Sequence, residues 1–388
     1  MYRTIFIVVF FFYLSTPLRA DELLNVGRAA SIDVMLENAI RRGLIAGGVV
    51  AVGNHTGLLY STAQGRQFPD TSSPLLTQRT LFDTASLTKV LATAPAVMKL
   101  LEQGKIGLLD PLSRWFPEFE DTDREDITIL NLLTHTSGLD DVDIPADDPL
   151  RSLIHKAMVQ HNGSLPGNRF RYADINFILL GELVQRASNT ALDKFCVENI
   201  YAPNGMADTT FLPQSELNQI APTADYNNKL KAGVVQDMNA RRLGGVSGHA
   251  GLFSNAGDLS RFATMILNHG NYNGVQVFSE RVIAQMTSPY FSNNGRVIRG
   301  LGWDINSPFS SPRGHYFSDM SFGHTGYSGS SIWIDTEQDL YVLLLTVRLD
   351  YANKRQFNQL RSDISSLAVS IFSTPRIASE FTIDTKIP

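Results

Sequence analysis

Apolar and polar positions follow different patterns at the ends of the chain and in its middle. Apolar residues in 32–42 recur at helical spacing until glycines break the pattern. Residues 48–53 and 58–62 are short β-branched or apolar runs, separated by the turn-like sequence 54–57. This order predicts a helix followed by a β-hairpin.

The C-terminal part repeats the same two signals in the opposite order. Residues 330–334 and 340–347 are apolar runs divided by the polar stretch 335–339. They predict a second hairpin, and the helical period of residues 358–372 predicts a closing helix.

The middle of the chain is mostly helical in period, with loops rich in proline, glycine and asparagine. The clearest helical runs are residues 91–101, 127–133, 177–186 and 258–267. We therefore expect an α+β fold, with one antiparallel sheet built from both termini, helices flanking it and a mainly helical lobe inserted. The predicted α/β lobe comprises about residues 31–85 and 270–375, and the helical lobe about 86–269, within one domain of residues 21–388.

The first twenty residues differ from the rest and resemble a secretory signal. Arg3 gives a short positive start, residues 5–14 carry no charge, and Pro17 precedes a cleavage position after Ala20. The uncharged run is shorter than the ~20 residues that span a bilayer. We expect cleavage and export to the periplasm or the exterior, without stable membrane insertion; an uncleaved anchor is the alternative.

Composition and charge restrict the class of protein further. The chain is 43% hydrophobic and 18% charged, as in ordinary globular proteins. Its 33 basic and 38 acidic residues give a net charge of -5, so we expect no nucleic-acid partner. Its one cysteine, Cys196, excludes an internal disulfide, and no Cys/His spacing indicates a zinc finger. The oligomeric state is not predicted.

Two residues at the start of the first helical run could form a nucleophile and its base. Ser86 and Lys89 are three positions apart, so they share one face of a helix. A desolvated lysine can lose its proton and then activate a hydroxyl group. By itself this pair is more often a helix cap beside a solvated lysine, so the hypothesis depends on other segments.

Two further segments carry polar residues at element boundaries. Tyr172 and Asp174 lie where a loop leads into a helix. His324, Thr325, Gly326 and Tyr327 come just before the predicted strand 330–334, where we expect an edge whose backbone N–H groups face a substrate.

In order and spacing these segments resemble the serine β-lactamase and penicillin-binding-protein superfamily, with S-x-x-K, Y-x-N and K-T-G motifs. The class C β-lactamase-like hydrolases are the most similar branch. The resemblance implies acyl transfer by Ser86, with Lys89 and a tyrosine of lowered pKa, Tyr172, sharing the proton. The N–H groups of Ser86 and Tyr327 would form the oxyanion hole. Neither a metal nor an organic cofactor is implied.

Two residues depart from the family pattern. Asp174 replaces the usual Asn and His324 the usual Lys, and both are expected to orient substrate or tune the Lys89–Tyr172 pair. A neutral imidazole holds a substrate carboxylate less well than a lysine does. We therefore expect weak binding of penicillins near pH 7, improving as His324 becomes protonated below about pH 6.5.

The stretch 237–254 resembles a subset of the family that includes N-acetylmuramoyl-L-alanine amidases. It places His249 near the groove, where it either contacts substrate or belongs to a tight turn. His135 is interpreted as structural. A zinc site built from His135, His249, His315 and His324 lacks any supporting spacing.

Together these observations predict an exported serine hydrolase that cleaves an amide or ester, with cell-wall muropeptides as candidate substrates. The alternatives are a promiscuous esterase, a D-amino-acid peptidase or a β-lactamase. An inactive protein that binds peptidoglycan fragments is the alternative of another class.

Overall fold

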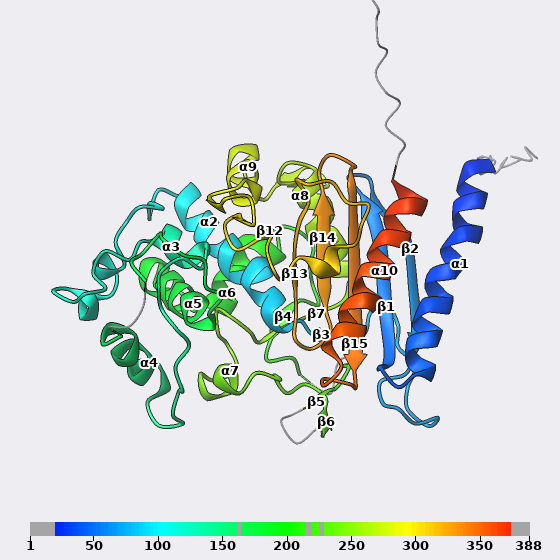
Figure 1. The fold of residues 1–388 in the computed structure, drawn as a ribbon, viewed down its shortest axis with the longest axis horizontal. Coiled ribbons are helices and arrows are strands. Elements are labelled where there is room, and N and C mark those ends of the chain that lie inside the picture. The colour runs from blue at the N-terminus through cyan, green and yellow to red at the C-terminus, as the bar shows by residue number, and fades with distance from the viewer. Residues whose placement is uncertain (1–19, 161–163, 215–218, 225–228, 374–388) are drawn as a thin grey trace, which may run out of the picture.

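The computed structural model describes residues 20–160, 164–214, 219–224 and 229–373. Residues 1–19 of the predicted signal peptide lie outside the described residues. The central element is an eight-stranded sheet in the order β10-β11-β12-β13-β14-β15-β1-β2, and all of its neighbouring strands are antiparallel (Figure 1). In chain order these strands are β1 (Ile45–Asn54), β2 (Gly57–Gly65), β10 (Phe291–Asn293), β11 (Val297–Arg299), β12 (Asp304–Asn306), β13 (Phe322–Thr325), β14 (Ser331–Asp335) and β15 (Leu340–Arg348).

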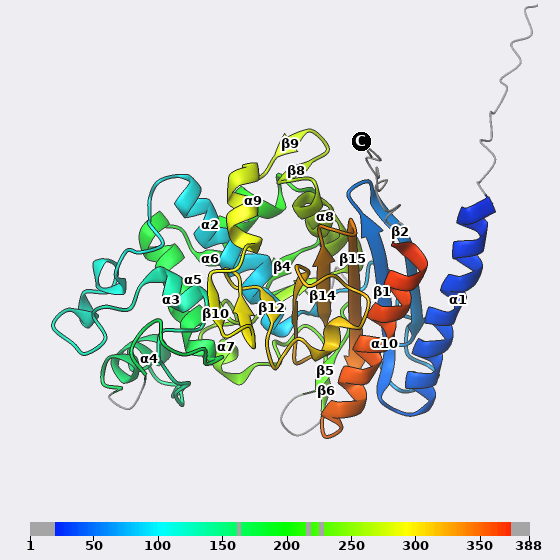
Figure 2. The same cartoon turned by 45° about the horizontal axis from the view of Figure 1, so that its top comes forward.

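Helices cover both faces of this sheet, because alternate side chains of its central strands point to opposite sides. Val50 and Val52 of β1 pack in the core beneath α1 (Ala20–Arg41) and α10 (Lys354–Phe372). Val49 and Ala51 join the larger core on the other face, where α8 (Ala256–Leu267) lies against β1 and β15. In Figure 2, α1 and α10 again lie side by side on one face.

The predicted α+β class and the antiparallel sheet are confirmed, since both ends of the chain contribute strands to it. Both predicted hairpins form: β1 pairs with β2, with Val52 opposite Tyr60, and β14 pairs with β15. The closing helix begins at Lys354, a turn earlier than its apolar period indicated, because Asn353 caps its N-terminus.

The segment between β2 and β10 supplies most of the remaining elements. Its helices are α2 (Ala94–Glu102), α3 (Ile129–Leu133), α4 (Pro149–Met158), α5 (Asp174–Ser188), α6 (Leu192–Cys196), α7 (Met238–Arg242) and α9 (Glu280–Thr287), besides α8. Short strands form three small sheets: β3 (Phe82–Asp83) with β7 (Leu252–Ser254) and β4 (Thr210–Phe211), β5 (Thr223–Ala224) with β6 (Leu230–Lys231), and β8 (Asn271–Tyr272) with β9 (Val275–Gln276). Within the described residues, no helix is both long and apolar enough to cross a membrane.

Single-turn and π-helical segments complete the fold. Four are 3₁₀ turns: η1 (Ala85–Leu87), η3 (Leu112–Arg114), η4 (Pro117–Phe119) and η6 (Ser311–Arg313). Two are π-helical turns, η2 (Lys89–Thr93) and η5 (Val197–Tyr201). The helix predicted over 91–101 therefore starts as a π-helix and becomes α-helical at Ala94.

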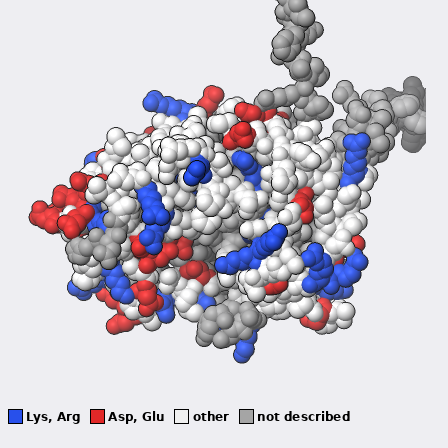
Figure 3. Space-filling view, in the orientation of Figure 1, with Lys and Arg blue, Asp and Glu red and all other residues white. Residues whose placement is uncertain are grey.

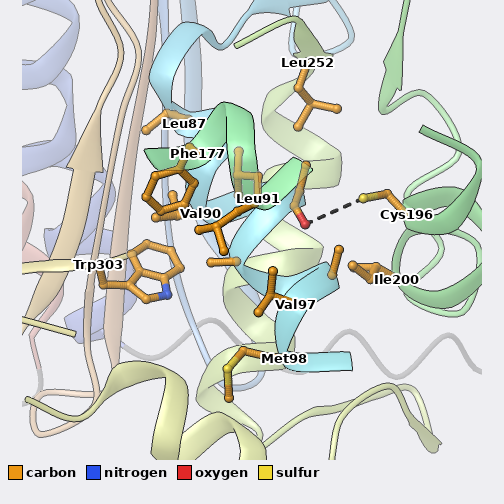
Figure 4. Packing of buried hydrophobic residues seen from close by; sticks show 14 of the residues in the cluster. Leu87, Val90, Leu91, Val97, Met98, Phe177, Cys196, Ile200, Leu252 and Trp303 are labelled. Carbon is orange, nitrogen blue, oxygen red and sulfur yellow. Dashed lines mark hydrogen bonds between the residues drawn. The ribbon is translucent and has the colours of Figure 1, made fainter. Parts of the chain in front are cut away.

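The π-helical start of this helix has an identifiable cause. Pro95 has no N–H group to donate to the carbonyl of Leu91, four residues earlier. The Leu91 carbonyl instead accepts from the Tyr201 hydroxyl at 3.2 Å, and the Ala92 carbonyl from the Cys196 thiol at 3.6 Å (Figure 4). Two buried side chains thus satisfy carbonyls of the segment that carries Lys89.

Candidate active site

Ser86 lies in a tight turn that directly follows β3. Ala85, before it, has φ 48°, a left-handed conformation that is uncommon for a residue with a side chain. Asp83 holds this turn, since its Oδ1 accepts from the Ala85 N–H at 2.8 Å. The third motif region reaches the same turn, where Ser328 and Ser330 donate to the carbonyls of Asp83 and Thr84 at 2.6 and 2.8 Å. The nucleophile candidate is thereby fixed against the sheet.

Lys89 lies directly behind Ser86 and is fully buried. Its Nζ donates to Ser86 Oγ at 3.0 Å and to the His249 carbonyl at 3.2 Å. It also forms an ion pair of 2.7 Å with Oδ1 of Asp174. Burial lowers the pKa of Lys89, but Asp174 and Tyr172 outweigh burial and raise it. Of the two states that the sequence allowed for Lys89, the protonated one fits its surroundings, because the Asp174 carboxylate supplies the charge that retains the proton.

Tyr172 lies beside this pair, at the N-terminal end of α5. Its ring stacks on His135 with centroids 4.5 Å apart, and Lys89 Nζ is 5.0 Å from the ring centre. Burial raises the pKa of Tyr172, and the Asp174 carboxylate adds to this, while Lys89 and Ser86 lower it less. The predicted fall of this pKa is therefore wrong: the phenol is neutral at neutral pH.

His135 has a supporting position, as the sequence suggested. It is 1% exposed, and Nδ1 accepts from the N–H of Ala173, next to Tyr172, at 3.3 Å. Burial lowers its pKa well below the usual value, with the nearby Arg299 and Lys89 charges acting in the same direction. His135 therefore acts as a neutral ring that orients Tyr172.

The third motif differs from its predicted form. His324 and Thr325 belong to a strand of their own, β13, which pairs with β14 and lies inside the sheet rather than at its edge. On its other side β13 pairs with β12 only at Gly323, opposite Asp304, so the residues that follow are open towards Ser86. The motif is therefore accessible because β12 does not pair with His324 and Thr325, although β13 is not an outer strand of the sheet.

His324 is 5% exposed, and its Nδ1 is 3.0 Å from the Thr325 carbonyl, which can only accept. Burial and the Arg299 and Lys89 charges lower its pKa well below 6.5. The expected protonation of His324 near pH 6.5 is therefore wrong. This histidine remains neutral and cannot replace the missing lysine.

Gly326 can only be a glycine at this place. A Cβ atom there would lie 2.2 Å from Ser330 Oγ and 2.4 Å from the Thr84 carbonyl. Its own carbonyl accepts from Arg361 at 2.6 Å. The following Tyr327 is 55% exposed and lies over the site.

Two cavities of about 550 and 270 Å³ meet at Ser86, Tyr172 and Tyr327, which line both. Asp174 lines the larger cavity, and His324, Thr325 and Gly326 line the smaller one. Figure 3, in the orientation of Figure 1, shows a hollow in the molecular surface. Acidic side chains lie on its side towards the helical segment, and basic ones lie towards the sheet and α10. The structure thus brings the predicted residues of all three motifs around one site.

The larger cavity carries two carboxylates, Asp174 and Asp237. Asp237 caps α7 by accepting from the Ala240 N–H at 2.7 Å, and it lies 2.9 Å from Nε2 of His249. Burial opposes ionisation of Asp237, but His249 and the α7 N–H group lower its pKa to about 2. The His249 side chain does not line either cavity; this histidine contributes to the site through Asp237 and through its own carbonyl, which holds Lys89.

Among the described residues, the one group with closely spaced metal-ligand atoms is Asp174, Asp237 and His249, within 4.8 Å of one another. The Lys89 ammonium already neutralises Asp174 at 2.7 Å. We therefore assign no metal site there. The four histidines considered from the sequence do not come together in this group.

The smaller cavity is lined by cations that the sequence analysis did not select. Arg348 at the end of β15 is 4% exposed and Arg361 of α10 is 5% exposed. Lys354 is exposed at the start of α10. The acid on this side, Asp304, is paired with Arg299 at 3.0 Å. An arginine that ends an apolar strand was the available signal, but its burial could not be read from the sequence.

Comparisons with known proteins agree with this geometry. The family profile described as Beta-lactamase matches residues 33–362. A protein of Escherichia coli (strain K12) named "Putative D-alanyl-D-alanine carboxypeptidase" is 31% identical over 310 residues, 70% of this chain and 69% of its own. A protein of the same name from Salmonella agona (strain SL483) is 30% identical over 311 residues, 70% of each chain.

Solved structures resemble the fold. The hydrolase EstCE1, described as having promiscuous acyltransferase activity, has a TM-score of 0.73 at 20% identity, covering 88% of this chain and 99% of its own. A class C beta-lactamase in complex with cefoxitin has a TM-score of 0.72 at 17% identity, covering 89% and 99%. At such identities the likeness concerns the fold alone.

Proposed function

The chain belongs to the beta-lactamase family of serine hydrolases, and from that premise we propose that it is an exported enzyme that cleaves carboxylate-bearing peptides through a Ser86 acyl-enzyme. The observation that carries the proposal is the contact of Ser86 Oγ with the buried Lys89 Nζ, 3.0 Å away, where two cavities meet. A binding protein has no need of a buried ion pair behind a serine hydroxyl.

In the proposed reaction Ser86 attacks the carbonyl carbon of an amide or ester. Lys89 and Tyr172 relay its proton away from Ser86 and later back to the leaving group, after which water releases the acyl group by the reverse sequence. The backbone N–H groups of Ser86 and Tyr327 stabilise the oxyanion, each contributing on the order of 10²–10³ in rate. Every step is assigned to side chains and backbone groups of the chain itself.

The smaller cavity supports a substrate with a carboxylate in its leaving group. Nη2 of Arg348 is buried and, among the described residues, has no hydrogen-bond partner. The neighbouring Asp350 interacts with this guanidinium at longer range, since its carboxylate accepts from the N–H groups of Ala352 and Asn353 at 3.0 Å and forms no ion pair with Arg348 among the described residues. A guanidinium that has lost its water and has no acid within an ion-pair distance favours an anionic ligand.

A terminal carboxylate next to the scissile bond is the chemistry of a peptide that ends in a free amino acid. The two relatives reported above carry the name "Putative D-alanyl-D-alanine carboxypeptidase", which describes this kind of substrate. We therefore favour muropeptide-like D-peptides over the amidase substrates suggested by residues 237–254. In this proposal Arg348 takes the role of the lysine that His324 replaces.

Ester cleavage is the second candidate, and the wall of the larger cavity favours it. Tyr327, Tyr351 and Met238 line that cavity and offer apolar surface for the acyl group. The neighbour EstCE1 is described as a hydrolase with promiscuous acyltransferase activity. An apolar acyl group with a neutral leaving group would use this wall without Arg348.

The test is labelling followed by a substrate panel on the purified chain. Labelling with an alkyl fluorophosphonate, located by peptide mass spectrometry, should modify Ser86 in the wild type and leave Ser86→Ala unmodified. The panel compares a D-alanyl-D-alanine peptide, the same peptide with an amidated C-terminus, a p-nitrophenyl ester and nitrocefin. Turnover of the free peptide well above the amidated one supports the proposal, whereas equal rates favour the ester candidate and an absent Ser86 adduct favours a binding protein.

A further inference from the structure

Lys89 cannot accept the Ser86 proton unless it gives one up. Three oxygens lie within 3.2 Å of Nζ, those of Ser86, His249 and Asp174, and the Tyr172 hydroxyl is a further hydrogen-bond partner. Ser86 is the source of the proton, and the His249 oxygen is a backbone carbonyl that does not take up a proton near neutral pH. The Asp174 carboxylate is the remaining acceptor.

The Asp174 oxygen that faces Lys89 is free to receive a proton. Oδ1 is buried and, apart from its ion pair with Lys89 at 2.7 Å, has no partner among the described residues. The Asp174 side chain is 31% exposed overall, so the rest of this carboxylate meets the larger cavity. Tyr172 does not compete for the proton, since its neutral phenol can only pass a proton on.

We propose that Asp174 is the final acceptor of the Ser86 proton, which it receives through Lys89. As Ser86 Oγ bonds to the substrate carbonyl carbon, its proton moves to Lys89 Nζ, and one proton of Lys89 moves to Asp174 Oδ1. The Lys89–Asp174 pair begins with no net charge and ends with one positive charge, which balances the oxyanion. When the leaving group departs, the protons move back and the leaving atom takes one.

This inference rests on the proposed function, because it needs Ser86 as the nucleophile. It gives Asp174 a role that an asparagine at the same place could not fill, since an amide does not accept a proton near neutral pH. Asp174 acts through Lys89: it holds the transferred proton until the leaving group departs, and it is assigned no contact with the substrate carbonyl.

The experiment measures the rate of Ser86 phosphonylation by an alkyl fluorophosphonate between pH 6 and 10, in the wild type and in Asp174→Asn. Ser86 Oγ bonds to phosphorus, fluoride leaves, and the Ser86 proton goes to the relay. We expect a flat wild-type profile from pH 6 to 9. Asp174→Asn should react about 10² to 10⁴-fold more slowly at pH 6, and its rate should rise with pH as Lys89 loses its proton.

The matched control is Asp141→Asn. Asp141 accepts from the Ile175 N–H at the same end of α5 at 3.0 Å. It interacts with the charges of Asp174 and Lys89, but among the described residues it forms no ion pair with Lys89, so it cannot take a proton from it directly. Besides Lys89, the titratable groups facing Asp174 are Tyr172, His249, Asp237 and Asp141. Asp174→Asn retains all of them, and the control changes Asp141 alone. We expect Asp141→Asn to keep the flat wild-type profile, so a change of shape belongs to Asp174.

A slower Asp174→Asn whose profile stays parallel to the wild type would overturn the inference, because it would show a structural role only. A second measurement needs no variant: the wild-type rate in mixtures of H₂O and D₂O should depend on deuterium content with the curvature of two moving protons, and a linear dependence would also overturn it. An unlabelled Ser86 in the wild type would instead refute the proposed function itself.

Discussion

Lys89 and Arg348 are two buried cations near Ser86, one in contact with it and one lining the same cavity, and their surroundings differ. Lys89 has an acid, a hydroxyl and a carbonyl within 3.2 Å. Arg348 donates to the carbonyls of Asp350 and Tyr327 at 3.0 and 3.2 Å, packs on aromatic rings, and keeps Nη2 without a partner among the described residues. Burial lowers the pKa of Arg348, whereas Asp174 raises that of Lys89 against the effect of burial.

The difference indicates how each cation serves the site. A cation whose charge is neutralised within the protein can exchange protons there without binding anything. A cation that lacks an acid is destabilised by its burial, and a ligand anion relieves that cost. The proton-handling side and the substrate-holding side of this site therefore differ in whether their buried charge has a partner inside the fold.

The largest expected effect comes from substituting Ser86 or Lys89, on the proton-handling side of the site. Ser86→Ala and Lys89→Met should each lower kcat/KM on the best substrate by about 10⁴-fold or more, and the double variant should lose no more than either single one, because the two residues act as a unit. Steady-state kinetics on all three variants measures this, with circular dichroism to confirm folding. Losses that add in the double variant would contradict the shared role.

Asp83 is the acidic counterpart of Arg348: it is buried, and among the described residues it forms no ion pair with a cation. Burial raises its pKa to about 6, although the N–H groups of Gln236 and Ala85 oppose this. Because the folded protein keeps this proton when the unfolded chain has lost it, the free energy of unfolding should fall by about 2 kcal/mol as the pH rises from 4 to 6.

The check on Asp83 is urea denaturation at pH 4 and pH 6, in the wild type and in Asp83→Asn. The asparagine variant has no such proton, so its stability should change less between the two pH values. An equal change in both proteins would mean that other groups cause it.

Arg348, the cation without an ion pair, should affect the cleavage only of substrates that have a free C-terminal carboxylate. Arg348→Gln should lower kcat/KM for a peptide with a free C-terminal carboxylate by about 10 to 100-fold, the value of a hydrogen bond to a charged group, and leave the amidated peptide or a neutral ester unaffected. The matched control is Arg355→Gln, which removes the same charge from an exposed position of α10 that lines neither cavity. Equal losses on both substrates would contradict the role of Arg348.

The smallest expected effect comes from removing a hydrogen bond between uncharged groups, in the π-helical turn that carries Lys89. Tyr201→Phe leaves the buried Leu91 carbonyl without its donor, and the free energy of unfolding should fall by about 1 kcal/mol. Activity per folded molecule should stay near the wild-type value, because η2 keeps its hydrogen bond from the Ala94 N–H to the Lys89 carbonyl. Thermal denaturation together with kinetics measures both, and a large loss of kcat would show that η2 depends on Tyr201.

Much of the fold could be predicted because it follows from local patterns. The runs 48–53 and 340–347 are buried on both faces in the structure, because β1 and β15 are neighbouring interior strands that helices cover on each side. β13 was missed because its four residues carry the third motif and have no apolar alternation. The π-helical start at Lys89 was missed although Pro95 lies in the same run, because the Leu91 and Ala92 carbonyls are satisfied by Tyr201 and Cys196, which are far away in the sequence.

The sequence by itself determined which residue types stand at which spacing. Ser86 and Lys89 are close in any helical turn, and the order of the three motifs follows from the chain alone. Tertiary structure decided the charge of each group. Asp174 keeps Lys89 protonated, Arg299 and burial keep His324 neutral, and Arg348 becomes a buried cation without an acid. The physical reason is that desolvation and Coulomb interactions depend on distances between residues that only folding brings together.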